Sequence, residues 1–160
     1  MHWADYTAQR LMGRGGEQVS ASGITPSGEF HIGHLREILS AEMIHRACLD
    51  AGVESKYIFI VDSMDPLRRV YDFLSPEYES YIGHPLAYIP APGSDGKPSD
   101  GSGTYADHFL GPFLDALEQI GVRPEVVMNH ETYESGGFAE CIDTAISKKE
   151  EIRGIIQEIS

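Results

Sequence analysis

Apolar residues recur along the chain with two different spacings. In residues 3–12 and 32–51 they lie three or four positions apart, which is the spacing of one helix face. Residues 17–23 are predicted to form the first strand, which ends with the apolar residues Val19 and Ala21. Lys56–Val61 is a continuous apolar run, typical of a strand covered on both faces of a parallel sheet. The order helix, strand, helix, strand predicts a lead-in helix followed by a βαβ unit.

The segment from Ser63 to Gly103 keeps neither spacing. Its prolines, among them Pro66, Pro76, Pro85, Pro90 and Pro92, exclude long regular elements, and a loop of this length inside a domain is usually functional or mobile. Residues 94–103, rich in Gly, Ser, Asp and Pro, are predicted to be its most flexible part.

Regular spacing returns after this loop. A helix is expected over Tyr105–Ile120, although Pro112 suggests that its regular part begins only there. A third strand is expected at Glu125–Met128. The last helices are expected at 131–146, either whole or broken at Gly136-Gly137, and at 148–159. Three strands alternating with helices predict an α/β fold containing half of a Rossmann-like parallel sheet.

The turn between the first strand and the long helix, Ser22–Arg36, carries the clearest chemistry. A helix N-terminus binds anions through its free N–H groups and its dipole, and Gly23 and Gly33 would let a ligand approach the backbone. His31 and His34 share the first helical turn and one helix face, so both can donate to phosphate oxygens. The alternative is a polar helix start without a ligand.

Other polar residues have a structural and a functional interpretation. Asp62 and Asp65 follow the second strand, where they would form a solvated turn and a helix cap or hold a substrate ammonium group. The same choice, between surface or core and a binding site, applies to Arg68, Arg69, Tyr105 and His108.

Composition narrows the functional classes. The chain has 160 residues, 41% of them hydrophobic, which suits one globular domain with a real core. A net charge of −13 argues against a broad nucleic-acid-binding surface. Cys48 and Cys141 lack metal-ligand spacing, and no disulfide framework is expected. Without a leader-like start or a membrane-length apolar run, the protein is expected to be cytoplasmic and to have no membrane partner.

The quartet His31-Ile32-Gly33-His34 resembles the nucleotide-binding signature of class I aminoacyl-tRNA synthetases. Five further segments resemble class I lysyl-tRNA synthetase in particular, so that the resemblance covers essentially the whole chain: Met1–Asp5, Ser22–Gly28, Asp62–Val70, Tyr105–Phe109 and Glu131–Gly136. The implied fold is the first half of the class I catalytic domain, a Rossmann-like sheet of the HUP type. The implied activity is formation of lysyl-adenylate from lysine and ATP, followed by transfer to tRNA(Lys).

The resemblance also implies roles for residues. His31 and His34 would be the catalytic pair. ATP would be bound by His31, Gly33, His34, Pro26 and Ser27, with Mg²⁺ accompanying the ATP and no dedicated metal site. Lysine would be bound by Gly23, Thr25, Asp62, Asp65, Tyr105 and His108.

Some family features do not match. Ser63 stands where the family tends to have Asp, Gly101-Ser102 where many members have Cys-His, and His34 where lysyl enzymes often have Asn. The half of the domain with the Lys-Met-Ser-Lys-Ser loop, and an anticodon-binding domain, do not occur in residues 1–160. We therefore expect this chain alone not to charge tRNA, and its uncovered first strand to favour self-association. A nucleotide-binding or docking module and a different adenylyltransferase remain the alternatives.

Overall fold

The computed structural model describes residues 1–101 and 103–159. The chain forms two compact units, Met1–Asn129 and His130–Ser160, and each is described by itself. The sequence-based expectation of one globular domain therefore applies to the first unit.

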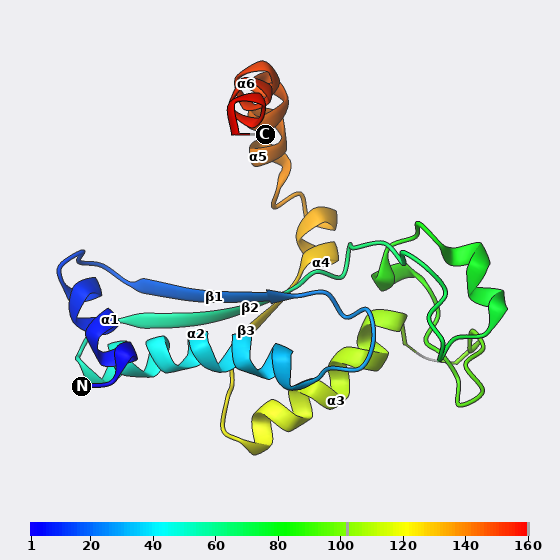
Figure 1. Ribbon diagram of the computed structural model, residues 1–160, viewed down its shortest axis with the longest axis horizontal. Helices are drawn as coiled ribbons and strands as arrows, with labels where there is room; N and C mark the ends of the chain where they lie inside the picture. Colours follow the sequence, from blue (N-terminus) through cyan, green and yellow to red (C-terminus); the bar gives the residue numbers. More distant parts are fainter. Residues whose placement is uncertain (102, 160) are drawn as a thin grey trace. The chain divides into compact units, whose positions relative to one another are not determined.

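A three-stranded parallel sheet organises the first unit (Figure 1). Its strands are β1 (Gln18–Ile24), β2 (Ser55–Val61) and β3 (Glu125–Met128), in the order β1-β2-β3. Ile24 pairs with Val61, and Val61 with Met128, so the three strands end level at their carboxyl ends. This confirms the predicted half of a Rossmann-like α/β sheet.

Two long helices cover one face of this sheet: α2 (Ile32–Asp50) and α3 (Tyr105–Gln119) (Figure 1). Parallel strand connections are right-handed, and the two connections step in the same direction across the sheet, so both helices lie on the same side. The core between them and the sheet contains Ile24, Ile38, Ala41, Tyr57, Phe59, Val61, Leu110, Phe113, Leu117 and Val122. The shorter helix α1 (Trp3–Met12), predicted with the same bounds, packs its small residues Ala4 and Ala8 in a separate cluster with Ala47 and Cys48 of α2.

The expectation that β2 is covered on both faces is wrong for the described residues. Tyr57, Phe59 and Val61 are buried, whereas Ile58 and Ile60 on the other face are only half-buried. The reason is topological, because α2 and α3 both cover the first face.

Helix α3 also differs from expectation, because it begins at Tyr105 and not at Pro112. Thr104 and Asp107 form a capping box: the Asp107 N–H donates to Thr104 Oγ1 and the Asp107 carboxylate accepts from the Thr104 N–H. This cap, together with burial of Tyr105, Phe109 and Phe113 along one face, outweighs the hydrogen bond that a proline inside a helix removes.

The long loop contains, among its described residues, only two short 3₁₀ helices, η1 (Pro76–Tyr81) and η2 (Leu86–Tyr88), as its prolines predict. It nevertheless has a core of its own, made with α3 by Leu67, Leu74, Tyr78, Leu86, Ile89, Tyr105, Ala106 and Phe109. Burial raises the pKa of Tyr78 to about 12, and its hydroxyl donates to the Pro90 carbonyl at 2.9 Å.

The stretch predicted to be most flexible is held to this core by hydrogen bonds. Gly96 has φ +76°, and a Cβ there would lie 2.6 Å from the Phe73 carbonyl oxygen, so only glycine fits. Its carbonyl accepts from the Ser75 N–H at 2.9 Å, and Ser99 donates through both N–H and Oγ to the Ala91 carbonyl. Ser102, part of the same stretch, lies outside the described residues.

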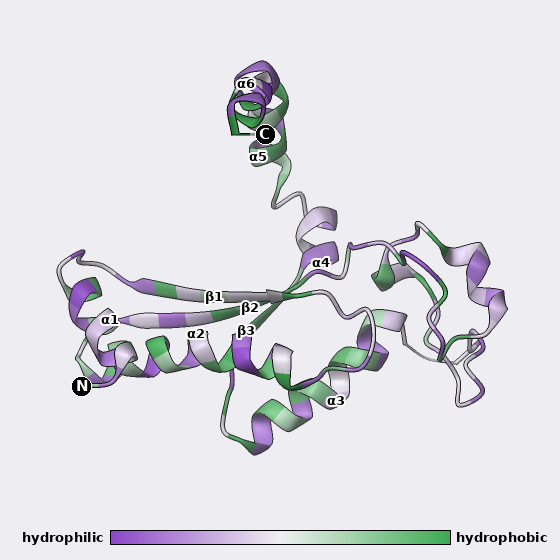
Figure 2. Cartoon of the chain, in the orientation of Figure 1, coloured by the Kyte–Doolittle hydropathy of each residue, from purple (hydrophilic) through white to green (hydrophobic). Residues whose placement is uncertain are grey.

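The second unit is helical. Helix α4 (Asn129–Glu134) leads into it, and α5 (Ala139–Ser147) and α6 (Lys149–Ile159) follow. The chain turns at Gly136, with φ +77°, so the expected helix over 131–146 is the broken one. Hydrophobic and hydrophilic residues alternate along α5 and α6 (Figure 2), and none of the unit's described residues is buried.

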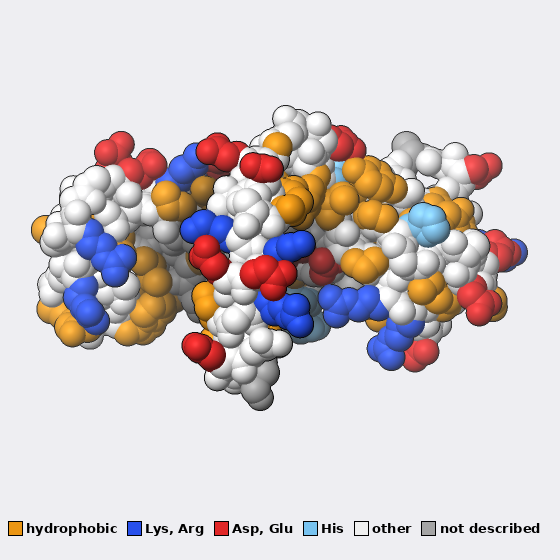
Figure 3. Space-filling view, turned by 90° about the horizontal axis from the view of Figure 1, so that it is seen from above, with side chains coloured by type: hydrophobic (Ala, Val, Ile, Leu, Met, Phe, Trp, Pro, Cys, Tyr) orange, Lys and Arg blue, Asp and Glu red, His pale blue; other side chains and the backbone are white. Residues whose placement is uncertain are grey.

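Several surface features bear on possible partners. Basic and acidic side chains are interspersed on the face shown in Figure 3. Within residues 1–101 and 103–159, no helix is both long enough and apolar enough to span a membrane. In the same residues β1 pairs only with β2 and leaves its other edge without a strand. Self-association through that edge stays a prediction.

Candidate active site

Polar residues gather where the three parallel strands end. The turn 25–31 follows β1, Asp62 follows β2 and Asn129 follows β3. Because the strands end level, these segments meet at one edge of the sheet, where open α/β sheets bind their ligands.

Two histidines cap the N-terminus of α2. His31 is the N-cap residue, and its Nδ1 accepts the Gly33 N–H at 3.1 Å. In return, His34 Nδ1 accepts the His31 N–H at 3.0 Å. The imidazole rings stack with their centroids 3.9 Å apart. This is a capping box made from two imidazoles, in which each ring satisfies one of the free backbone donors of a helix start.

The cap determines the tautomer of both rings. A nitrogen that accepts an N–H cannot itself carry hydrogen, so in the neutral rings the hydrogen is on Nε2, on the side away from the backbone. Burial and the neighbouring His31 lower the pKa of His34, against a smaller opposite effect of Glu37. The neutral tautomer with an outward Nε2–H is therefore favoured, and it can donate to an anionic oxygen.

The His31 ring explains why position 33 is occupied by glycine. A Cβ at this position would lie 2.8 Å from His31 Cε1 and 2.9 Å from His31 Nδ1, closer than side chains approach. Gly33 thus makes room for the imidazole that caps the helix, whatever space it also leaves for a ligand.

Gly33→Ala is expected to displace the His31 ring and abolish its cap. Loss of a cap costs about 0.5–2 kcal/mol, and alanine regains up to about 1 kcal/mol of helix propensity, so the free energy of unfolding is expected to change little. The ¹⁵N shifts of the His31 ring are expected to lose the signature of a hydrogen-bonded, unprotonated Nδ1. The matched control is Gly111→Ala in α3, where a Cβ meets nothing within 4 Å. An unchanged His31 spectrum in Gly33→Ala would contradict this account of the glycine.

Carboxylates gather at the end of β1, beside Gly23 and Thr25. Thr25 donates its hydroxyl to Asp65 Oδ2 at 2.6 Å, and Arg68 lies 3.6 Å from the same oxygen. Glu37, one turn along α2 from His34, accepts the Gly23 N–H with Oε1 at 3.1 Å. Gly23 lies on the unpaired edge of β1, so Glu37 occupies a donor that a neighbouring strand would otherwise use.

Asp62 stands between these carboxylates and β3. Asn129 donates its side-chain N–H to Asp62 Oδ1 at 2.7 Å. Burial raises the pKa of Asp62, and the charges of Asp65 and Glu37 raise it further, whereas the Asn129 hydrogen bond lowers it. Crowding of negative charge makes this region suited to a cationic group.

Asp62→Asn is expected to stabilise the chain at pH 7. A carboxyl group whose pKa is raised in the folded state binds a proton more readily there than when unfolded, so its ionisation destabilises the fold as pH rises above about 3.9. Asparagine removes that repulsion and can still accept from Asn129. Thermal melts are expected to give a higher Tm for the variant at pH 7 and equal values below about pH 3.9. A lower Tm at pH 7 would contradict the assigned repulsion.

Tyr105 is fully buried, and its hydroxyl donates to the Ser27 carbonyl at 2.8 Å. Burial raises the pKa of Tyr105 well above its usual range, which keeps this donor protonated. Pro26, in the same turn, is also buried. The contacts of Tyr105 therefore hold the turn that precedes the histidine cap, and its hydroxyl is already engaged.

Two adjoining cavities connect these groups. One, of about 330 Å³, is lined by Gly23, Ile24, Thr25, Ser27, His34, Glu37, Pro66, Arg68 and Tyr71. The other, of about 640 Å³, is lined by Thr25, Ser27, Gly28, Glu29, His31, His34, Tyr71, Phe73, Pro92, Gly93, Ser94, Gly96, His108 and Phe109. Thr25, Ser27, His34 and Tyr71 line both. We call the two together the reaction cavity; it has a carboxylate end near Glu37 and a histidine end near His31.

The structure thus brings most of the expected site residues to one place. His31, His34, Ser27, Gly23, Thr25 and His108 line the reaction cavity, and Asp65 is bonded to Thr25. Asp62 lies beside Gly23, because a Cβ on Gly23 would be 3.6 Å from its Oδ2. Arg69 is exposed and packs over the Tyr71 ring.

Two residues were missed by reasoning from the sequence alone. Glu37 lies three positions after His34, on the same helix face, and that spacing is a signal that was available. Asn129 directly follows the third strand, which places it level with Asp62. No group of three or more His, Cys, Asp or Glu side chains in the described part of the chain is arranged to hold a metal ion.

The profile of the family described as tRNA synthetases class I (K) matches residues 1–160. The chain belongs to this family. It is 42% identical over its full length to "Lysine--tRNA ligase 1" of Methanosarcina acetivorans, covering 29% of that protein. It is also 43% identical over its full length to a lysine-tRNA ligase of Archaeoglobus fulgidus, of which it covers 31%. For a Methanococcus maripaludis relative of the same name the identity is 44% over 98% of the chain and 28% of the relative.

The resemblance inferred from the histidine signature is thereby confirmed at the level of the family. The chain spans roughly 30% of the length of these relatives. Where the sequence departs from the family, Ser63 is fully buried and its carbonyl accepts the Ala87 N–H, so it supports the long loop. Gly101 is exposed, and Ser102 lies outside the described residues.

Proposed function

We propose that the chain is the N-terminal portion of the catalytic domain of a lysine-tRNA ligase, which activates lysine with ATP and transfers it to tRNA(Lys). The observation that carries the proposal is the polarity of the reaction cavity. Its histidine end offers two outward N–H donors at a helix N-terminus, and its carboxylate end offers Glu37 beside Asp62 and Asp65. A phosphate chain suits the first and an ammonium group the second.

In the first step, a lysine carboxylate oxygen attacks the α-phosphorus of ATP, the bond from that phosphorus to the bridging oxygen breaks, and pyrophosphate leaves. His31 and His34 donate from Nε2 to phosphate oxygens that gain charge in the transition state. No covalent enzyme intermediate is needed, so the histidine end of the reaction cavity contributes positioning and charge stabilisation. In the second step, a ribose hydroxyl of tRNA attacks the lysyl carbonyl and AMP leaves.

The substrate's ammonium groups are assigned to the carboxylate end. Glu37 and Asp62 face the space beside Gly23, and Thr25 holds the Asp65 carboxylate in place. Mg²⁺ enters with ATP and is held by its phosphates, which fits its preference for few protein ligands. The remaining expected roles, those of Pro26, Tyr105 and His108, are consistent with positions around the same turn and cavity.

The decisive experiment uses a chimera in which residues 1–160 replace the matching segment of the M. acetivorans relative. Lysine-dependent exchange between ATP and pyrophosphate is expected. Exchange that depends on another amino acid would favour a different adenylyltransferase, and ATP binding without any exchange would favour a nucleotide-binding module. The isolated chain is expected to bind ATP weakly and not to acylate tRNA.

Thr25→Ala is expected to weaken lysine binding several-fold to about tenfold, because a typical hydrogen bond contributes about 0.5–1.5 kcal/mol. Without the Thr25 hydroxyl, Asp65 loses its 2.6 Å donor and turns toward Arg68. Calorimetric titration of lysine measures the effect, with Thr25→Ser as the matched control that retains the hydroxyl. A variant that binds lysine normally but ATP poorly would move Thr25 to the nucleotide end.

A further inference from the structure

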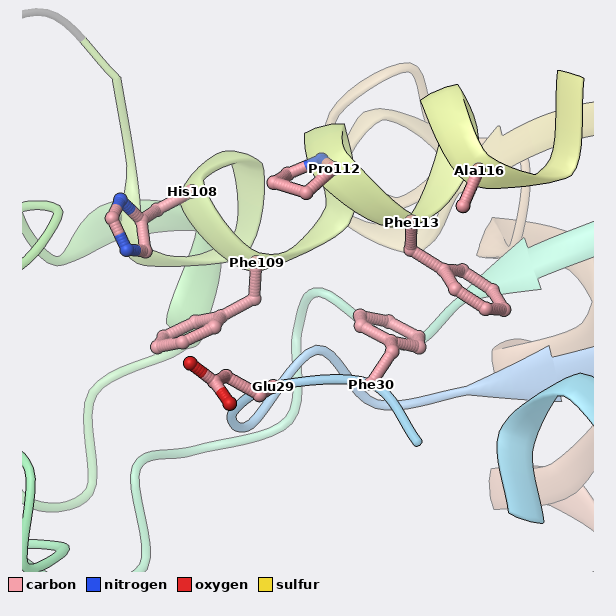
Figure 4. Close-up of a pocket in the computed structure, with 7 residues that line it drawn as sticks. All are labelled: Glu29, Phe30, His108, Phe109, Pro112, Phe113 and Ala116. Atoms are coloured by element: carbon pink, nitrogen blue, oxygen red, sulfur yellow. The ribbon is translucent and has the colours of Figure 1, made fainter. Parts of the chain in front are cut away.

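A third cavity, of about 340 Å³, lies between α3 and the segment that precedes the histidine cap (Figure 4). Its lining residues are Glu29, Phe30, His108, Phe109, Pro112, Phe113 and Ala116. We call it the ring pocket. Nothing in the reaction assigned above uses it.

The walls of the ring pocket are mainly aromatic. Phe30 and Phe113 stack with their centroids 4.2 Å apart and an interplanar angle of 13°, and Phe109 points from α3 toward the same space. The Glu29 carboxylate lies beside the Phe109 ring (Figure 4) and is exposed, with no hydrogen bond or ion pair among the described residues. A flat ring with an amino group at its edge matches such walls, because it can pack on the phenyl rings while its N–H donates to Glu29.

The ring pocket adjoins the reaction cavity. Glu29, His108 and Phe109 line both. A ligand in the ring pocket therefore has its next chemical group at the histidine end. The negative charge of Glu29 disfavours a phosphate in the ring pocket itself, so the base and not the backbone of a nucleotide belongs there.

We propose that the ring pocket holds one base of the unpaired acceptor end of tRNA. This inference rests on the proposed function, in which that end must reach the lysyl-adenylate. The acceptor end reads CCA, and each of its bases carries an exocyclic amino group that a carboxylate can accept. Proteins recognise single-stranded RNA in part by stacking bases on aromatic side chains, and the stacking contact itself involves no charged side chain. This mode suits a chain with a net charge of −13.

The test measures binding of the trinucleotides CCA and UUU to the 160-residue chain by saturation-transfer NMR, with ATP titrated separately. CCA is expected to bind and UUU to bind more weakly, because uracil has no amino group. Ala116→Trp fills the ring pocket from an exposed position and is expected to weaken CCA binding at least about fivefold, the equivalent of about 1 kcal/mol of stacking. Glu29→Gln is expected to remove the preference for CCA over UUU.

The matched control is Glu118→Trp, which adds the same side chain to an exposed position of α3 outside the ring pocket and is expected to leave CCA binding unchanged. Circular dichroism checks that each variant is folded. Equal binding of CCA and UUU, no detectable CCA binding, or unchanged CCA binding in Ala116→Trp would overturn the proposal. So would a loss of ATP binding in Ala116→Trp with CCA unaffected, which would assign the ring pocket to the adenine of ATP.

Failure of this inference is distinguishable from failure of the proposed function. Lysine-dependent exchange in the chimera tests the reaction and does not involve the acceptor end. A chimera that activates lysine but whose ring-pocket variants charge tRNA normally would remove only the inference. Trinucleotide binding that responds to Ala116→Trp, in a chain whose chimera fails to activate lysine, would remove only the proposed function.

Discussion

Replacing His31 or His34 with alanine is expected to slow lysyl-adenylate formation about 10²–10³-fold, with little change in lysine affinity. Each substitution removes an Nε2–H donor aimed at oxygens that gain charge in the transition state. It also removes one half of the cap, since His31 Nδ1 holds the Gly33 N–H and His34 Nδ1 holds the His31 N–H. Single-turnover formation of adenylate by the chimera measures the effect.

Two controls separate the donor from the cap. Ile32 lies between the histidines with 79% of its surface exposed, and Ile32→Ala is expected to leave the rate unchanged. His34→Asn supplies another side chain that can accept the His31 N–H, and it is expected to restore part of the rate lost in His34→Ala. An unchanged rate in either alanine variant would refute the assignment of the pair.

Because of the same two histidines, the rate of adenylate formation is expected to fall at acidic pH. Protonation of His34 puts hydrogen on Nδ1, where it faces the His31 N–H and breaks the cap. The pKa of His34 is lowered in the folded chain, so the cap's contribution to stability is complete above the ordinary histidine pKa of about 6.5 and is lost as pH falls below it. Adenylate formation is therefore expected to decline on the acid side of that value.

Glu37→Gln is expected to weaken lysine binding about tenfold or more while ATP binding is retained. A hydrogen bond to a charged group contributes about 1.5–3 kcal/mol, and glutamine loses the charge that an ammonium group requires. Glutamine has nearly the same shape, and its Oε1 can still accept the Gly23 N–H, so the fold is not expected to change. Calorimetric titration of lysine and of ATP into the chimera gives the two affinities.

Glu54→Gln provides the matched control, because Glu54 is exposed and lies just before β2, at the opposite end of the sheet from the site. It is expected to leave both affinities unchanged. Equal losses of lysine and ATP affinity in Glu37→Gln would indicate a disturbed helix start, and normal lysine affinity would exclude Glu37 as an ammonium partner.

The sequence predicted those features that depend on local pattern. Strand and helix bounds followed from apolar spacing, and the histidine site followed from a turn between a strand and a helix. Pro112 alone indicates a later start for α3, but the cap formed by Thr104 and Asp107 has the stronger effect and begins the helix at Tyr105. Local patterns compete, and their relative strengths become visible only in the folded chain.

Contacts between distant residues were beyond this kind of reasoning. Glu37 lies between Leu35 and Ile38 and looks like a solvated helix position, but it bonds to Gly23 because α2 packs along β1. Tyr105 is buried in the core of the long loop, which is one of the two interpretations that the sequence allows, but its bond to the Ser27 carbonyl has no signal in the sequence. Both contacts depend on how elements pack, which composition and spacing do not encode.

The position of Phe30 has a consequence for how the molecule opens. Phe30 packs against both hydrophobic clusters, the one under the sheet and the one inside the long loop. Clusters of this kind unfold locally as separate cooperative units, each with its own opening equilibrium visible in hydrogen exchange. A ligand that immobilises the turn around Phe30 raises the free energy needed to open either cluster. The affinity for that ligand therefore includes the free energy of keeping the long loop closed.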